Sequence, residues 1–121
     1  MACETKELWR RRVRIGDKEF EVRAKSLWCV SDEGGYIETD SEEYLEIIPL
    51  NAPGNPVEIH LWPEVEEVGN NLRVRWTPRY KLSGTAGEAR KYYTQLARKL
   101  GLTKKELTAL MGLVSGFGGR R

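Results

Sequence analysis

Two pairs of strand-like segments, each joined by a glycine-containing turn, constrain the fold of this chain most strongly. In the first pair, Gly16-Asp17 separates LWRRRVRI from EFEVRA, and apolar and charged residues alternate in both. A two-residue turn of this kind is typical of a β-hairpin. The expected cross-strand pairs are Val13–Phe20 and Trp9–Ala24 on one face, and Arg14–Glu19 and Arg12–Glu21 on the other. Most of the arginine run is thus predicted to form a salt-bridged outer face.

The second pair of segments lies between residues 57 and 76. VEIHLW alternates with Val57, Ile59 and Leu61 on one face, and EVEEV and LRVRW follow Pro63. If Gly69-Asn70 is the turn, the opposed pairs are Val65–Val74, Glu66–Arg73 and Glu64–Arg75. A turn at Asn70-Asn71 is the alternative, and it would shift this register.

The segments between the two hairpins are less regular. SLWCV and YIET are predicted to be strands separated by the turn SDEGG. A short helix is expected over 41–48, because Asp40 and Glu43 fit a capping box and Tyr44, Ile47 and Ile48 have helical spacing. A strand over the same residues is the alternative.

The C-terminal part has helical periodicity. From Ala86, one face of a helix carries Ala89, Tyr93, Leu96, Ala97 and Leu100, and Gly101 ends the pattern. Thr103 and Glu106 form a capping box for a second helix. Its buried stripe is expected to be Leu107, Leu110, Met111 and Val114. The glycine-rich end SGFGGRR is expected to fray.

These elements predict an α+β fold, an antiparallel sheet of hairpins or a meander followed by a two-helix hairpin. A chain of 121 residues is expected to form a single domain, 1–121. Residues 1–82 would be mainly β with an acidic segment over 32–68, residues 83–116 the helical hairpin, and 117–121 a frayed tail.

The composition indicates a cytoplasmic protein without cofactor or metal. No apolar run approaches the roughly 20 residues that a membrane span needs, and the N-terminus does not resemble a secretory signal. The two cysteines, Cys3 and Cys29, and the single histidine, His60, do not make a zinc site. Cys29 is expected to be a buried strand residue and Cys3 to lie in a mobile end; a disulfide between them is the alternative. The single glutamine and abundant Glu, Lys and Arg resemble heat-adapted proteins, in which such a disulfide is less unusual.

Charge is divided into blocks along the chain. Residues 1–31 carry 8 bases and 5 acids, residues 32–68 carry 11 acids and no base, and residues 69–121 carry 12 bases and 2 acids. The block charges of +3, −11 and +10 sum to the net charge of +2. This asymmetry points to an anionic partner, or to association between complementary surfaces.

The strongest candidate for a binding surface is the segment 79–99. Lys91 and Arg98 are expected to face away from the apolar stripe of the helix, with Tyr92 nearby. Such a pattern suits phosphate contacts and base stacking. The candidate nucleic-acid-binding residues are Arg79, Tyr80, Lys81, Arg90, Lys91, Arg98 and Lys99. The alternative is a solvated basic face, balanced by the acidic block of the same molecule.

Two further segments contain glycine motifs. SGTAGEARK lacks the P-loop and dinucleotide patterns, and Ser83 or Thr85 is expected to be an ordinary helix cap. LGLTKKELTALMGLVSG resembles the first half of a bacterial-type helix-turn-helix, which would imply DNA binding. The segment departs from that pattern at Val114, and the following SGFGGRR should not hold a recognition helix.

The sequence therefore leaves three classes of function. The first is a small nucleic-acid-binding module that uses the basic helix, with DNA or RNA as its partner. The second is an assembly module, a homo-oligomer in which acidic and basic surfaces of different subunits meet. The third is a small enzyme, for which a Cys29–His60 pair or a divalent cation held by Asp40, Glu42, Glu43 and Glu46 would be needed.

Overall fold

The structure, a computed structural model, describes residues 2–78 and 85–118, apart from the side chains of residues 33, 36, 38, 40, 74–76 and 115–118. This part of the chain forms a five-stranded antiparallel sheet followed by two helices, which confirms the predicted α+β class. The strands lie in the sheet in chain order, as a meander. The elements are β1 (Ala2–Ile15), β2 (Lys18–Glu33), β3 (Tyr36–Pro49), β4 (Val57–Val68), β5 (Asn71–Pro78), α1 (Ala86–Leu100) and α2 (Lys104–Gly118).

The first hairpin has the predicted register. β1 and β2 turn at Gly16-Asp17, and the four expected pairs, Val13–Phe20, Trp9–Ala24, Arg14–Glu19 and Arg12–Glu21, lie opposite one another. Phe20 is completely buried. On the outer face, Arg14 Nη2 lies 2.7 Å from Glu19 Oε1. The arginine run is thus largely accounted for by the sheet surface.

The predicted helix over 41–48 is wrong, since these residues belong to β3. β3 pairs with β2 along its whole length and with β4 over residues 43–47, so its backbone groups find partners on two sides. Alternate side chains enter the core, with Leu45 and Ile47 buried and Glu46 on the other face. The segments SLWCV and YIET are parts of the long strands β2 and β3 rather than separate strands.

The second hairpin also has its predicted register. β4 and β5 turn at Gly69-Asn70, where Gly69 has a φ of 64°. The pairs are Val65–Val74, Glu66–Arg73 and Glu64–Arg75. β4 runs without interruption through Pro63, so VEIHLW and EVEEV form one strand.

Both helices begin at the predicted caps. Glu88 N–H donates to Thr85 Oγ1 at 3.2 Å, and Thr85 N–H donates to Glu88 Oε2 at 3.3 Å. Thr103 and Glu106 make the same reciprocal bonds at 3.1 Å and 3.0 Å. α1 ends at Gly101, which is left-handed with φ 72°. Ser83, the other candidate cap, lies outside the described residues.

The partial resemblance to a helix-turn-helix does not extend to the structure. α2 is one helix from Lys104 to Gly118 and passes straight through Gly112, where the motif would require a turn. Leu107, Leu110 and Val114 are buried, as the amphipathic pattern predicted. The helix also extends to Gly118, beyond the expected end at 116, and the tail residues 119–121 lie outside the described residues.

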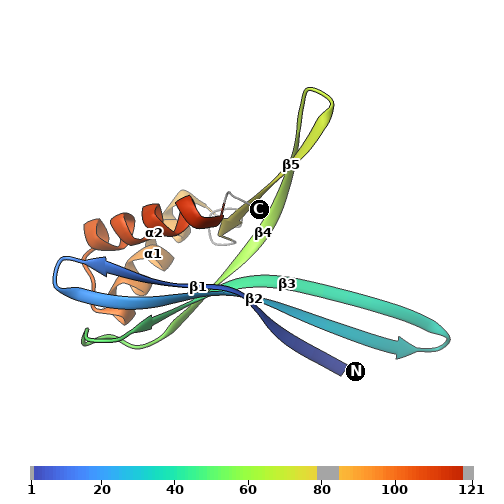
Figure 1. Cartoon of the computed structure of the whole chain (residues 1–121), viewed down its shortest axis with the longest axis horizontal. Coiled ribbons are helices and arrows are strands. Elements are labelled where there is room, and N and C mark those ends of the chain that lie inside the picture. The colour runs from blue at the N-terminus through green and yellow to red at the C-terminus, as the bar shows by residue number, and fades with distance from the viewer. Residues whose placement is uncertain (1, 79–84, 119–121) are drawn as a thin grey trace.

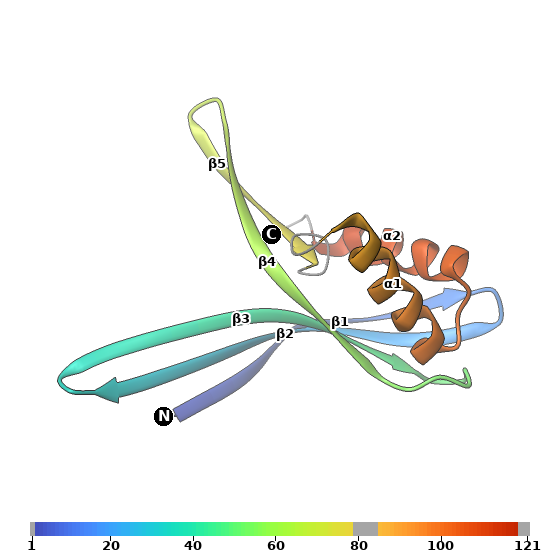
Figure 2. The same cartoon turned by 180° about the vertical axis from the view of Figure 1, so that it is seen from behind.

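One layer of helices covers one face of the sheet at only one end of the molecule (Figure 1). The core between them contains Val13, Ile15, Phe20, Val22, Ala24, Leu45, Ile47, Val57, Ile59, Leu96, Ala97, Leu100, Leu102, Leu107, Leu110 and Val114. The β2–β3 turn lies at the opposite end from the helices, and the β4–β5 hairpin projects in a third direction (Figures 1 and 2). We call residues 26–43 the β2–β3 arm and residues 62–77 the β4–β5 arm.

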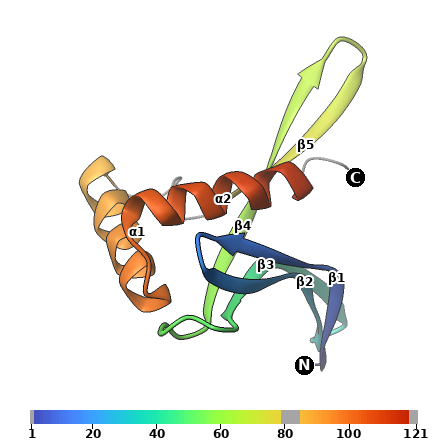
Figure 3. The same ribbon diagram turned by 60° about the vertical axis from the view of Figure 1, so that its left-hand side comes forward.

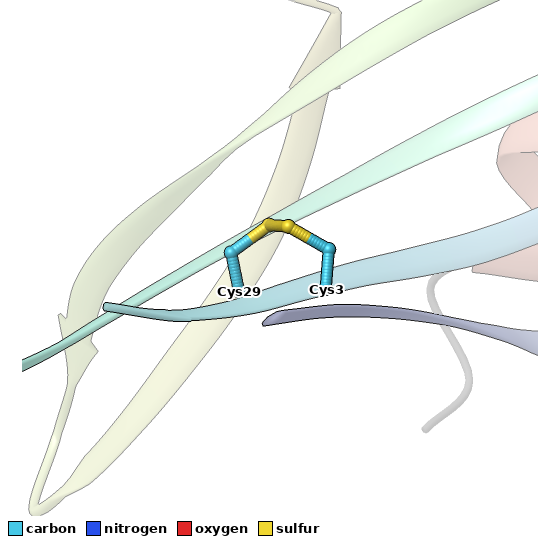
Figure 4. Close-up of a disulfide and its surroundings, with 2 residues drawn as sticks. All are labelled: Cys3 and Cys29. Atoms are coloured by element: carbon cyan, nitrogen blue, oxygen red, sulfur yellow. A yellow bond between two sulfur atoms is a disulfide. The ribbon is translucent and has the colours of Figure 1, made fainter. Parts of the chain in front are cut away.

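Cys3 and Cys29 form a disulfide, which corrects the expectation of unpaired cysteines with Cys3 in a mobile end. Cys3 lies in β1 directly opposite Cys29 in β2, with 4.1 Å between the Cα atoms. The bond joins β1 to the β2 strand of the β2–β3 arm (Figure 4). A one-residue bulge at Leu8 shifts the register between Glu7 and Trp9 and brings the cysteines into line.

Candidate nucleic-acid interface

Helix α1 presents a basic face to solvent. Leu96, Ala97 and Leu100 hold the helix against the core, and Lys91 and Arg98 lie on the opposite side. Arg90, Lys91, Arg98 and Lys99 are all exposed. Arg98 and Lys99 also occupy the last turn, where positive charge is favoured by the helix dipole. The helix thus places four of the seven predicted site residues on or beside one surface.

The lysine and arginine side chains of the sheet differ from those of α1, because most of the described ones have an acidic neighbour. Arg23 Nη2 lies 2.7 Å from Glu21 Oε2, and Lys25 Nζ lies 3.3 Å from Glu46 Oε1. Arg10 contacts Glu7 and Glu21 at 3.0 Å and 3.6 Å. These contacts form one charge network on the outer face of β1, β2 and β3.

No such network reaches α1. Within residues 2–78 and 85–118, none of Arg90, Lys91, Arg98 and Lys99 makes an ion pair with another described side chain. The acidic residues of the β2–β3 arm do not compensate them, since this arm lies at the other end of the molecule (Figures 1 and 2). The positive charge of the helix is therefore available to an external anion.

A shallow groove lies beside this basic face, between α1 and the start of β4. Its volume is about 250 Å³, and it is lined by Pro56, Val57, Glu58, Tyr92, Gln95, Leu96 and Lys99. Tyr92 is 40% exposed and offers an aromatic face, and Lys99 offers a cation. Among the described lining residues, Glu58 on β4 is the one acid and would repel an anion. An anion would therefore bind on the α1 side of the groove, near Lys99.

The list of candidate residues differs from the prediction before and after α1. Arg79, Tyr80 and Lys81 lie outside the described residues, so the structure places only the members of the list that belong to α1. Lys104 and Lys105, at the start of α2, are exposed and were not in the predicted set. They could have been predicted from the sequence, because they form a basic pair directly after the Thr103 cap and only a short connection separates them from Lys99.

The Cys29–His60 pair, one of the two catalytic alternatives, is overturned. The Cys29 thiol is consumed in the disulfide, so it cannot be a nucleophile activated by His60. His60 Nδ1 instead lies 2.7 Å from Glu42 Oε1, and its ring stacks on Tyr44 with the centroids 5.5 Å apart. The imidazole is therefore held on the outer face of the sheet by neighbours on β3.

The acidic metal site proposed from the sequence includes Asp40, whose side chain lies outside the described residues, and the other three acids do not share one face. Strand alternation sends Glu42 and Glu46 to one face of β3 and Glu43 to the other. Glu46 is engaged by Arg23 and Lys25. Among the described residues, no group of three or more His, Cys, Asp or Glu side chains is arranged to hold a metal ion.

Two carboxyl groups have shifted pKa values, and both are part of structural contacts. The hydrogen bond from Arg23 lowers the pKa of Glu21, with smaller contributions from the charges of Arg23, Arg10 and Arg12. The backbone N–H of Thr103, and then Lys18, lower the pKa of Glu106. Both groups stabilise the fold as carboxylates and lie away from the α1 face.

Comparison with protein families, with curated proteins and with solved structures found no match. Neither of the described helices is long and apolar enough to cross a membrane.

Proposed function

We propose that this protein is a small nucleic-acid-binding module that contacts phosphates through the exposed face of α1. The observation that carries the proposal is the absence of ion pairs between Arg90, Lys91, Arg98 or Lys99 and any described side chain, while most sheet cations are paired. A lysine or arginine without an acidic neighbour neutralises a phosphate, and releases the counterions condensed on the nucleic acid, without first breaking an ion pair. The module works in the cytoplasm, where disulfides like Cys3–Cys29 persist in proteins of hyperthermophiles.

The proposed contact has two parts. Lys91 and Arg98 lie seven residues apart, so about 10 Å of helix separates them, and each can contact a different phosphate of a backbone that follows the helix. Tyr92 and Lys99 lie in the groove beside this line, where one unpaired base stacks on the tyrosine ring. Single-stranded nucleic acid is therefore expected to bind more tightly than a duplex of the same length.

The test is a binding titration with labelled mixed-sequence oligonucleotides of single-stranded DNA, duplex DNA and RNA over a range of salt concentrations. For duplex DNA, the log–log slope should approach −0.9 for each phosphate contact. The double variant Lys91→Ala with Arg98→Ala should weaken binding to all sequences. Because two phosphate contacts are lost, the magnitude of the log–log slope should fall by about 2. Its stability should change by less than about 0.5 kcal/mol per site, because both residues are exposed.

The matched control is Lys6→Ala with Arg12→Ala, which removes the same charge from exposed positions on β1. This variant should bind almost as the parent does. If it binds as weakly as the α1 variant, only net charge matters and α1 is not the contact. If the parent binds none of the probes at low salt, the proposed function is wrong.

Head-to-tail assembly is a second candidate function, supported by the placement of the acids. Residues 32–43 carry six acids and no base, and they lie in the β2–β3 arm. The arm projects away from the helices of its own molecule (Figures 1 and 2). In this second proposal it meets the basic α1 face of the next copy, and repetition of that contact builds an open chain.

A further inference from the structure

The sheet divides into two arms where β3 and β4 separate. β3 pairs with β4 only from Glu43 to Ile47, whereas it pairs with β2 along its whole length. Beyond Leu61, β4 pairs with β5 alone, and the two arms leave the common sheet in different directions (Figures 1 and 3). Among the described residues, no strand pairs with the β4 side of β3 over residues 36–42. This stretch is therefore an open sheet edge, with backbone N–H and C=O groups directed outward.

The residues that guard this edge carry charge of one sign only. Sheet edges are commonly protected from further pairing by charged side chains and by proline. β1 and β5 carry arginines, and Pro63, which has no N–H group to donate, lies two residues beyond the point where β4 leaves β3. Residues 36–42 contain no lysine, arginine or proline, and their acids are Glu38, Asp40 and Glu42. Such an edge repels an acidic strand but not a basic one.

The three acids occupy alternate positions and therefore one face of β3. Leu45 and Ile47 are buried in the core between the sheet and the helices. Because side chains alternate along a strand, positions 37, 39 and 41 continue that face, and positions 38, 40 and 42 belong to the outer face. Ile37 is 74% exposed. A strand added at this edge thus has acidic residues beside its outer face, and apolar or hydroxyl residues beside its other face.

The β2–β3 arm provides no base for this acidic face. The residues of β2 opposite positions 38, 40 and 42 are Ser31, Cys29 and Leu27. The arm contains no lysine or arginine at all, and Glu42 contacts His60 of β4. Glu46, nearer the helices, instead contacts Arg23 and Lys25 across the same two strands. A strand that joins the open edge is therefore expected to supply the balancing charge.

We propose that the open edge of β3 binds an extended segment of a partner protein in which lysine or arginine alternates with apolar or hydroxyl residues. The backbone of residues 36–42 pairs with this segment as in a sheet, and its basic side chains lie across from Glu38, Asp40 and Glu42. Opposite charges across an antiparallel pair are favourable, and like charges are unfavourable. The same rule disfavours antiparallel pairing of this edge with the same edge of a second copy, because acids would then lie opposite acids. The contact is independent of the α1 face and of the proposed function.

The test is a titration of the full chain with the fluorescently labelled peptide Thr-Arg-Val-Arg-Val-Arg-Thr. The parent should bind this peptide, and amide hydrogen exchange should slow within residues 36–42, because outward N–H groups gain acceptors. The same peptide N-methylated at its central residues keeps the charge but cannot donate backbone hydrogen bonds, so it should bind at least about tenfold more weakly. The reordered peptide Arg-Arg-Arg-Val-Val-Thr-Thr, which lacks the alternation, should also bind more weakly.

Two matched variants locate the contact. Glu38→Gln with Asp40→Asn should weaken peptide binding about threefold or more, because two favourable cross-strand charge pairs are lost. Glu64→Gln with Glu66→Gln removes the same charge from the β4–β5 arm and should bind the peptide as the parent does. Lys91→Ala with Arg98→Ala should bind the peptide at least as tightly as the parent, so this test does not depend on nucleic-acid binding.

The proposal is wrong if the parent does not bind the peptide, or if the N-methylated peptide binds equally well, since charge attraction alone would then explain the binding. Equal loss in the β4–β5 control, or unchanged exchange over residues 36–42 with saturating peptide, also overturns it. Sedimentation of the parent over the same concentrations tests a second copy as the occupant. If the parent forms an oligomer that the peptide displaces, the edge belongs to that copy and the assignment to a partner protein is wrong.

Discussion

Gly54 shows how a single residue sets the distance between the loop before β4 and the end of α1. A Cβ atom added at Gly54 would overlap the backbone of Leu100. Next to it, Asn55 N–H donates to Lys99 O at 2.7 Å. Gly54→Ala must therefore move the loop or the helix end, and we expect it to cost about 1–3 kcal/mol of unfolding free energy.

Urea unfolding of Gly54→Ala measures this cost, with Gly112→Ala as the control. A Cβ atom at Gly112 meets nothing within 4 Å, and the residue lies inside α2. The control should be more stable than the parent by about 0.5–1 kcal/mol, because alanine favours helix. A Gly54→Ala variant as stable as the parent would show that this loop does not fix the position of α1.

Glu106 links α2 to the first hairpin and makes that link dependent on pH. Lys18 Nζ lies 3.4 Å from Glu106 Oε1 and donates to Gly101 O at 3.2 Å. Since the folded state lowers the pKa of Glu106, its contribution is fully present above the ordinary carboxyl pKa and is lost as pH falls through the lowered value. Glu106→Gln keeps the cap geometry and removes the titration.

We therefore expect the parent to lose more stability than Glu106→Gln when the pH is lowered from neutrality to about 3. Urea midpoints at the two pH values measure the difference. Glu21, whose pKa is also lowered, keeps part of the acid sensitivity in both proteins. Equal losses in parent and variant would mean that the contact with Lys18 and Thr103 contributes nothing in solution.

At the level of elements, the disulfide stabilises an arm that has no core of its own. Cys3 and Cys29 are separated by 26 residues, and closing a loop of that size stabilises a fold by up to about 3.5 kcal/mol. Reduction should chiefly release β1 from the β2–β3 arm. We expect faster amide hydrogen exchange over residues 2–7 and 25–30, and unchanged exchange in α1 and α2. If protection is lost uniformly, the bond stabilises the whole domain and not the arm.

The hairpins were predictable because their information is local. At Gly16-Asp17 and Gly69-Asn70, a short turn fixes the register of the hairpin. The same register places opposite charges across from one another, so two independent signals in the sequence agree. The helix caps at Thr85 and Thr103 were predictable for the same reason, because each depends on residues three positions apart.

The predictions that were wrong concern features that depend on partners far away in the chain. Tyr44, Ile47 and Ile48 have helical spacing, but the strand over these residues is decided by pairing with β2 and β4. The disulfide depends on the bulge at Leu8. Continued without the bulge, the register of Trp9 and Ala24 would place Cys3 opposite Val30 rather than Cys29. Of the candidate interface, the basic face of α1 was predictable from periodicity, but the groove beside Tyr92 required the packing of α1 on β4.

On the scale of the whole molecule, three surfaces of different charge point in different directions. The β2–β3 arm is acidic, the β4–β5 arm is nearly neutral and the α1 face is basic. Because they lie on separate parts of the structure (Figures 1 and 3), each can be altered without disturbing the others. Salt weakens the contacts that the acidic and the basic surface can make, because it screens charge.

A charge exchange between copies tests the second candidate function, head-to-tail assembly. One variant carries Arg90→Glu, Lys91→Glu, Arg98→Glu and Lys99→Glu, which makes the α1 face acidic. The other carries Asp32→Lys, Glu42→Lys and Glu43→Lys on the β2–β3 arm and Glu4→Lys on the adjoining part of β1, which leaves three acids and four bases at these positions. Each variant alone sets like charges against like, so neither should form salt-sensitive oligomers. In a mixture, each α1 face meets an arm of opposite charge, and assembly at low salt should return.

The mixture decides between the two uses of the α1 face. Recovery of salt-sensitive oligomers only on mixing means that the arm of one copy binds the helix of another, and it would then compete with nucleic acid for the same cations. If the mixture stays as dispersed as its components, head-to-tail assembly is wrong. The variant with lysines at the four acidic positions should in either case bind oligonucleotides at least as tightly as the parent, because its α1 face is intact and its net charge is more positive.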